Sequence, residues 1–190
     1  MARRNLLKRL LLVAWQQTIR RYYERQQINS ERGLQVFFCQ SLISQFDAAK
    51  VPRRLFVEPT LTAGNSSSSP KPDVLICNRH RIIGVVELKY LPRANANYRK
   101  DLQTLEWCGS HADSIQIRNE RYLGRQSASK YYSLANDAVL CWAGVFNRPI
   151  VLSLRGKVSE KIHSHFMELH AVTVPGGIPT IYSNYTPRSR

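Results

Sequence analysis

The sequence predicts one α/β domain in which helices cover both faces of a mixed β-sheet. The chain has 190 residues, a length that suits a single domain with one hydrophobic core. Hydrophobic residues make up 43% and charged residues 22%, a balance typical of a folded globular protein. The expected elements run in the order two helices, three strands and a helix, followed by strand-rich and helical pieces. We therefore expect residues 1–190 to form one domain.

Residues 1–27 predict a basic amphipathic helix with its arginines outside. The side chains expected to face the core are Leu6, Leu10, Val13 and Trp15. The apolar run is too short for the core of a signal peptide and far too short to cross a bilayer. A transit peptide or a helix lying on a membrane surface is the alternative interpretation of this acid-free start. We expect a soluble, intracellular, cytoplasmic protein that has no membrane partner.

Residues 29–46 predict a second helix. Ser30 is a suitable N-cap, and the acidic Glu31 follows it in the first turn. Apolar residues are dense along the segment, namely Leu34, Val36, Phe37, Phe38, Leu42, Ile43 and Phe46. This stripe is broad, so we expect a well-buried helix that stops before Pro52.

The middle of the chain predicts three strands and a helix. The strands are expected near residues 53–61, 73–77 and 81–90, and a helix over 97–108 places Leu102 and Leu105 inward. Residues 62–72 are rich in Gly, Ser and Pro and predict a flexible connection between strands of one sheet.

The last third is less regular. Residues 127–137 are compatible with a helix, whereas the branched and aromatic residues of 138–146 predict a buried strand. Weaker patterns suggest a strand at 149–154, a helix at 159–166, a strand at 169–174 and a frayed basic tail at 183–190.

The chain is strongly basic. It has 28 Lys and Arg against 13 Asp and Glu, a net charge of +15. Nucleic acid is the commonest partner for such an excess, while an anionic membrane surface and simple solubility are alternatives. The four cysteines form no CxxC pair and the histidines are scattered, so neither a zinc site nor a redox motif is indicated. Buried free thiols in a reducing cytoplasm fit this spacing.

The stretch KPDVLICNRHRIIGVVELKY, residues 71–90, carries three charges on apolar strands. Side chains alternate along a strand, so Glu87 and Lys89 share one face. A turn of three or five residues after Cys77 is expected to set Asp73 opposite Glu87, and a turn of four misses by one. Two carboxylates so close repel unless a cation lies between them, and Mg²⁺, with Mn²⁺ as a possible substitute, is the natural oxygen-liganded ion. The alternative is a solvated hairpin with a surface Glu–Lys pair of little energetic weight.

Lys89 would have a chemical use beside such an ion. Its ammonium can hydrogen-bond an attacking water and a scissile phosphate, where negative charge builds in the transition state. A metal that lowers its pKa would also let it help remove the water's proton. Together these groups suit metal-assisted hydrolysis of a phosphodiester.

Pro72–Asp73 followed by Glu87–Leu88–Lys89, read as "PD" and "ELK", resembles the PD-(D/E)xK nuclease superfamily. That superfamily includes restriction endonucleases, Holliday-junction resolvases, repair nucleases and phage-defence effectors. The resemblance covers roughly residues 30–107 and implies a restriction-endonuclease-like fold, a mixed sheet flanked by helices.

The resemblance also implies roles for individual residues. Asp73 and Glu87 match the metal-binding acids, and Lys89 matches the catalytic lysine. Glu31 stands where many members add a glutamate from the preceding helix, although an acid in a first turn is also favoured by the helix dipole alone. Gln35 lies one turn later on the same face.

Further polar residues are candidates for contacting nucleic acid. The helix after the motif offers Lys100 and Gln103, as in some members of the superfamily. Other basic residues that cluster near the motif in sequence are Arg53, Arg54, Arg79, Arg81, Arg93 and Arg99. A basic cluster of this kind suits phosphate contacts, and a solvated charge run is the alternative.

These observations predict a Mg²⁺-dependent nuclease acting on DNA, with RNA as a further possible substrate, in restriction, repair or phage defence. Cutting both strands would call for a homodimer, and a partner protein could supply targeting. A non-catalytic nucleic-acid-binding module on the same fold is the alternative, and a peripheral membrane protein using the first helix is a third hypothesis.

Overall fold

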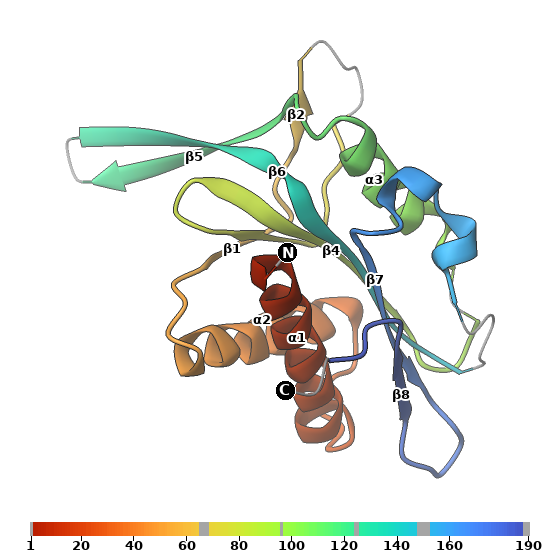
Figure 1. Ribbon diagram of the computed structural model, residues 1–190. Helices are drawn as coiled ribbons and strands as arrows, with labels where there is room; N and C mark the ends of the chain where they lie inside the picture. Colours follow the sequence, from red (N-terminus) through yellow and green to blue (C-terminus); the bar gives the residue numbers. More distant parts are fainter. Residues whose placement is uncertain (1, 65–68, 96, 124–125, 148–152, 188–190) are drawn as a thin grey trace.

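The computed structural model describes residues 2–64, 69–95, 97–123, 126–147 and 153–187 (Figure 1). The helices are α1 (Ala2–Thr18), the π-helical turn η1 (Ile19–Tyr23), α2 (Glu31–Ala48), α3 (Arg99–Ser110), and the short 3₁₀ helices η2 (Arg155–Lys157) and η3 (Glu160–Ile162). The strands are β1 (Arg54–Val57), β2 (Thr62–Ala63), β3 (Val74–Cys77), β4 (Arg81–Leu91), β5 (Ile115–Leu123), β6 (Gln126–Phe146), β7 (Phe166–Val172) and β8 (Thr180–Ser183).

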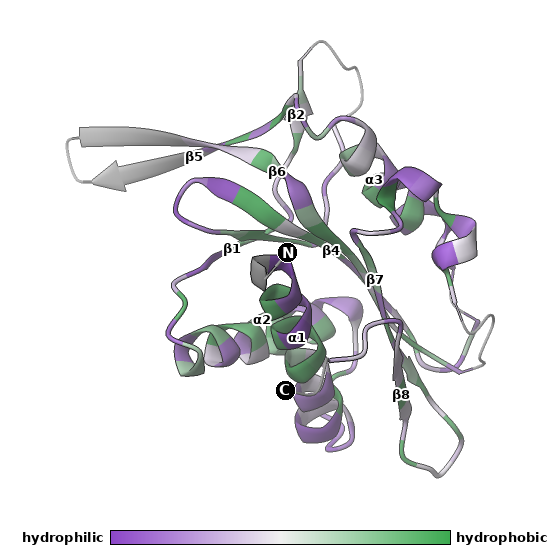
Figure 2. Cartoon of the chain, in the orientation of Figure 1, coloured by the Kyte–Doolittle hydropathy of each residue, from purple (hydrophilic) through white to green (hydrophobic). Residues whose placement is uncertain are grey.

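Within these residues the strands form one mixed sheet, which confirms the predicted α/β class. The order is β1-β3-β4-β6-β5-β2, and the pair β7-β8 joins through β6. The pairs β4–β6 and β6–β7 are parallel, whereas the other pairs are antiparallel. The β6 strand therefore lies at the centre, and hydrophobic residues run along β4, β6 and β7 (Figure 2).

Helices cover both faces of the sheet, as expected. On one face, α1 and α2 contribute Leu11, Trp15 and Phe38, which have no exposed surface. On the other face, α3 buries Leu102 and Leu105 in a separate core cluster. The central strands are covered on both sides, which explains their nearly continuous apolar sequence.

The helix predicted at the start exists, but its buried stripe is shifted. Leu10 and Trp15 are buried as expected, whereas Val13 is 37% exposed and was assigned to the wrong face. The positions Leu7 and Leu11 complete the buried face instead. A run of consecutive apolar residues supports more than one stripe, and only the packing partner selects between them.

The second helix begins as predicted, since the side chain of Ser30 accepts a hydrogen bond from the Gly33 N–H at 3.1 Å. The expectation that the whole apolar stripe is buried was wrong, because Val36 is 61% and Ile43 51% exposed. The helix rests on the sheet with one face only, along Leu34, Phe38, Leu42 and Phe46.

The β3–β4 register decides where the two acids of the motif lie. Cys77 pairs with Ile82, a register that would set Asp73 one residue away from Glu87. A β-bulge then inserts Ile83, so that Ile76 pairs with Gly84 and Val74 with Val86. Asp73, one residue before β3, therefore stands opposite Glu87. The turn between Cys77 and Ile82 has four residues, the length expected to miss by one, and the bulge restores the pairing. Bulge and turn together set this register.

The helix considered for residues 127–137 is wrong, because this segment belongs to β6. Burial alternates with a period of two here: Tyr131 is 59% exposed, while Tyr132 and Leu134 are buried. Before Ser133, β6 pairs only with β5, and the two form a ribbon that projects from the body (Figure 1).

The remaining weak patterns have mixed outcomes. The strand expected at 169–174 is β7 and begins earlier, and the helix expected at 159–166 is only the single turn η3. The strand suggested at 149–154 lies largely outside the described residues, as do residues 65–68 of the 62–72 connection. The tail is partly ordered, since Ser183 ends β8 and the Tyr185 hydroxyl donates to the Asn5 carbonyl at 3.1 Å.

Candidate functional site

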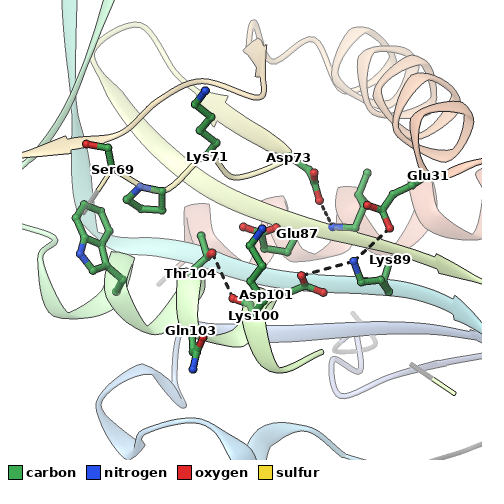
Figure 3. A pocket seen from close by; sticks show the side chains of 13 residues that line it. Glu31, Ser69, Lys71, Asp73, Glu87, Lys89, Lys100, Asp101, Gln103 and Thr104 are labelled. Carbon is green, nitrogen blue, oxygen red and sulfur yellow. Dashed lines mark hydrogen bonds and ion pairs between the residues drawn. The ribbon is translucent and has the colours of Figure 1, made fainter. Parts of the chain in front are cut away.

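One open cleft of about 590 Å³ gathers the motif residues (Figure 3). It lies on the sheet face covered by α3 and is closed at one side by the start of α2. Its lining residues are Glu31, Ser69, Pro70, Lys71, Asp73, Glu87, Leu88, Lys89, Lys100, Asp101, Gln103, Thr104 and Trp107. The predicted site residues Asp73, Glu87, Lys89, Glu31, Lys100 and Gln103 thus meet at one place.

Asp73 is fixed at the start of β3. Its Oδ2 accepts a hydrogen bond from the Leu88 N–H at 2.6 Å, and its main-chain carbonyl accepts one from the Gln35 amide at 3.0 Å. Gln35, a predicted site residue, therefore supports the backbone of Asp73 from α2. Burial raises the pKa of Asp73 to about 6, against the opposing effect of the Leu88 hydrogen bond.

Glu87 is the least hydrated acid of the motif. It is 6% exposed, and within the described part of the chain its Oε1 is buried without a hydrogen-bond partner. Burial, reinforced by the charges of Asp73 and Asp101, raises the pKa of Glu87 to about 9. Without a cation beside it, this carboxyl therefore holds a proton at neutral pH.

Lys89 lies between two carboxylates. Its Nζ is 3.3 Å from Glu31 Oε2 and 3.8 Å from Asp101 Oδ1. Partial burial by itself lowers the pKa of Lys89, but the attraction of Asp101 and Glu31 outweighs it and raises the pKa above its ordinary value. The side chain is therefore a fixed positive charge in the cleft.

Glu31 reaches the site from the first turn of α2. Besides Lys89, its Oε2 accepts a hydrogen bond from the Tyr90 N–H at 3.2 Å. Its side chain is 45% exposed, so water has access to this side of the cleft. The N-cap at Ser30 sets where the helix begins and hence where this carboxylate lies.

Asp73 and Glu87 are the acids placed to hold a divalent metal. Among the described residues, no three or more His, Cys, Asp or Glu side chains stand together as a ready metal site. The chemistry of the pair nevertheless fits a hard cation, because two facing carboxyls have raised pKa values and one buried oxygen has no partner in the described part of the chain. A cation would supply the missing partner of Glu87 Oε1 and favour ionisation of both groups.

Asp101 is a site residue that the sequence reasoning missed. It lies on α3, is 6% exposed, and contacts Lys89 and the indole of Trp142. Burial raises the pKa of Asp101, against the opposing effects of Lys89 and the Trp142 hydrogen bond. Its spacing was a usable signal, since Asp101 stands four residues before the inward Leu105 on the expected helix.

None of the six arginines predicted to contact nucleic acid lines the cleft. Arg53 and Arg54 are near the start of β1, and Arg79 and Arg81 are at the β3–β4 turn, at the opposite end of β4 from Lys89. Arg93 follows β4, and Arg99 lines a shallower hollow on α3. Their contacts with nucleic acid stay a prediction.

Comparison of the chain with models of known protein families, with curated proteins and with solved structures finds no match. Among the described helices, none combines the length and the apolar character needed to cross a membrane.

Proposed function

We propose that the protein is a metal-dependent nuclease of the PD-(D/E)xK type that hydrolyses phosphodiester bonds in DNA. The convergence of Asp73, Glu87 and Lys89 in one cleft, with Glu87 Oε1 buried and without a partner among the described residues, carries the proposal. A solvated hairpin would not bury a carboxylate oxygen without a partner, because that costs free energy unless a ligand compensates it.

Asp73 and Glu87 would hold the metal, Mg²⁺ or Mn²⁺, with Glu31 as a further candidate ligand. The metal would supply a Lewis acid and lower the pKa of a bound water. Lys89 then provides the positive charge that stabilises the scissile phosphate as negative charge develops on it. Asp73 is held in place by the Leu88 N–H and, through its backbone, by Gln35.

Affinity for DNA would come from the basic surface. The net charge of +15 favours a polyanion, and Lys71 and Lys100 bring part of it to the cleft. A restriction-endonuclease-like arrangement of the sheet is part of this proposal. One such site cuts one strand at a time, so cleavage of both strands would require a homodimer or sequential nicking.

The test is a cleavage assay on supercoiled, linear and single-stranded DNA and on RNA, with Mg²⁺, with Mn²⁺ and with EDTA. We expect cleavage that requires metal, and a loss of about 10²- to 10³-fold in Lys89→Ala, as for other single groups that stabilise transition-state charge. Lys161→Ala, on η3 and outside the lining of the cleft, is the matched control and should cut like the wild type. Equal behaviour of wild type and Lys89→Ala on every substrate would rule out the catalytic role. Binding without cleavage by the wild type would favour a non-catalytic nucleic-acid-binding module.

A further inference from the structure

Beside the cleft, the same face of the sheet carries a row of buried side chains that the motif does not include. In the parallel ladders Glu87 pairs with Trp142, and Trp142 pairs with Glu168. Two residues further, Lys89 pairs with Gly144, and Gly144 pairs with His170. The indole of Trp142 is therefore attached to the strand beside β4, on the sheet face that carries Glu87 and Lys89.

Gly144 makes room for this indole. A β-carbon at Gly144 would lie 2.3 Å from Cη2 and 2.8 Å from Cζ2 of Trp142, so the ring lies directly over the glycine. The ring of His170 contacts the indole edge-on with centroids 5.4 Å apart, and Phe146 lies at 6.0 Å. The His170 Nε2 in turn lies 3.1 Å from the buried Glu168. Trp142 has no exposed surface, so its orientation is set by packing on all sides.

The only polar atom of this indole is directed at Asp101. Trp142 Nε1 donates a hydrogen bond to Asp101 Oδ2 at 3.1 Å, which leaves Oδ1 facing Lys89 at 3.8 Å. The two oxygens of Asp101 thus have different partners, and the carboxylate cannot rotate without losing one of them. The side chain of Asp101 is 8% exposed, so little water competes for either contact.

Lys89 therefore has two anionic neighbours, a buried carboxylate that is held in place and a more exposed one. Glu31 is nearer and accepts a hydrogen bond from the Tyr90 N–H, but its side chain is 45% exposed at the edge of the cleft. Exposed ion pairs of that kind contribute little to holding a long side chain in one position. Asp101 is fixed by a buried hydrogen bond, so it can determine where the ammonium stays.

We propose that Trp142, seated on Gly144, fixes the carboxylate of Asp101, and that Asp101 in turn positions the Lys89 ammonium for the scissile phosphate. Asp101 and Trp142 are positioning residues, since they act through Lys89. The proposal rests on the proposed nuclease function, because it assigns them a role in that reaction.

The test compares two tryptophan variants that make the same chemical change. Trp142→Phe removes the indole N–H and keeps an aromatic ring, and we expect kcat to fall about 10- to 100-fold with KM little changed, because a misplaced catalytic group costs rate rather than affinity. Trp15→Phe is the matched control, since Trp15 is equally buried and its Nε1 has no hydrogen-bond partner within the described residues. It should keep the wild-type kcat. Asp101→Asn, which keeps an acceptor for the indole but loses the charge, should lower kcat at least as far.

A second measurement separates this proposal from the nuclease function. The indole N–H signal of Trp142 in a ¹H–¹⁵N spectrum, assigned by its loss in Trp142→Phe, should shift in Asp101→Asn and in Lys89→Met but not in Trp15→Phe. An unshifted signal in Asp101→Asn overturns the proposal whether or not the protein cuts DNA. An unchanged kcat in Trp142→Phe also overturns it, while leaving the nuclease assignment intact. If the wild type cuts no substrate, the proposed nuclease function is refuted, and so is the positioning role of Asp101 and Trp142.

Discussion

Glu87 shows how a single residue can conflict with its surroundings. It follows the apolar run Ile82–Val86 of β4, is 6% exposed, and has one oxygen without a partner in the described chain. Burying this carboxyl as a bare anion costs free energy. The cost is lower if the group is protonated or if it binds a cation. Both routes can be measured without any assay of activity.

Protonation gives the first prediction, for the metal-free protein. The pKa of Glu87 is raised by burial to about 9, above its ordinary value, so its stabilising contribution is complete below that ordinary value and is lost as pH rises toward 9. We expect Glu87→Gln in EDTA to raise Tm relative to the wild type, and to raise it more at pH 8 than at pH 5. Glu160→Gln, at an exposed position on η3, should show no such trend. An equal difference in Tm at both pH values would contradict the prediction.

Cation binding gives the second prediction. A ligand that binds only the folded state stabilises it by about 2.7 kcal/mol when its concentration is about 100 times Kd. We therefore expect Mg²⁺ or Mn²⁺ to raise the Tm of the wild type by several degrees and to have a much smaller effect on Glu87→Gln. Thermal unfolding with and without EDTA measures this, and a metal-induced increase that is equal in both proteins would place the metal elsewhere.

Part of the site could be predicted from the sequence at this scale. Strand alternation puts Glu87 and Lys89 on one face, and this needs only local information. Asp101 could have been predicted from its spacing to Leu105 on the expected helix. Trp142 and Gly144 were not, because their position depends on which distant strand pairs with β4, and no local pattern specifies that partner.

At the scale of elements, the bulge in β4 and the start of α2 place the catalytic candidates. Asn78 closes the β3–β4 turn, with its Oδ1 accepting hydrogen bonds from the N–H groups of His80 and Arg81. Ile83 adds the extra residue that brings Glu87 opposite Asp73. The alternation of side chains along a strand does not reveal a bulge. The sequence therefore suggested that Asp73 and Glu87 lie opposite each other, but not that a bulge brings this about.

The start of α2 leads to a third prediction. Ser30→Ala removes the N-cap hydrogen bond to Gly33, and we expect a loss of about 1 kcal/mol in the free energy of unfolding. Ser30→Asn, which keeps a side-chain oxygen as acceptor for the Gly33 N–H, should cost little. Denaturant unfolding distinguishes the two variants, and equal losses would show that the cap bond is not the cause.

The elements predicted best are those with strong local periodicity, such as α2, α3 and the two strands of the motif. The β5–β6 ribbon was missed because its residues are polar and its pairing depends on the neighbouring strand. The helix expected near residues 159–166 failed for a related reason: the segment is held by tertiary contacts, and only η3 has helical backbone.

At the scale of the whole molecule, the excess of positive charge is the dominant property. Twenty-eight basic residues face thirteen acidic ones, and four of the acids, Glu31, Asp73, Glu87 and Asp101, line the cleft. The rest of the described surface is correspondingly more basic than the total suggests. A polyanion would be attracted broadly, and in the cleft Lys71, Lys89 and Lys100 balance most of the acidic charge.

The fourth prediction concerns salt. If the protein contacts six to ten phosphates, its affinity for DNA should fall by about 10³- to 10⁵-fold between 50 and 200 mM salt. Fluorescence anisotropy with Lys89→Ala in EDTA, where we expect no cleavage, measures this. Arg81→Ala should reduce the salt slope by about one if that end of the sheet contacts DNA. A binding constant that hardly changes with salt would argue against nucleic acid as the partner.

The position of α1 has a consequence for how the chain reaches this structure. The helix is synthesised before the strands on which it packs, since Leu11 and Trp15 share a core with Met167 and Leu169 of β7. A growing chain can pack α1 against α2 early, but the side of α1 that faces β6 and β7 stays uncovered until the last third has left the ribosome, which makes closure of this core a late event. Nascent chains that stall before β7 should accordingly depend on chaperones and be rapidly degraded.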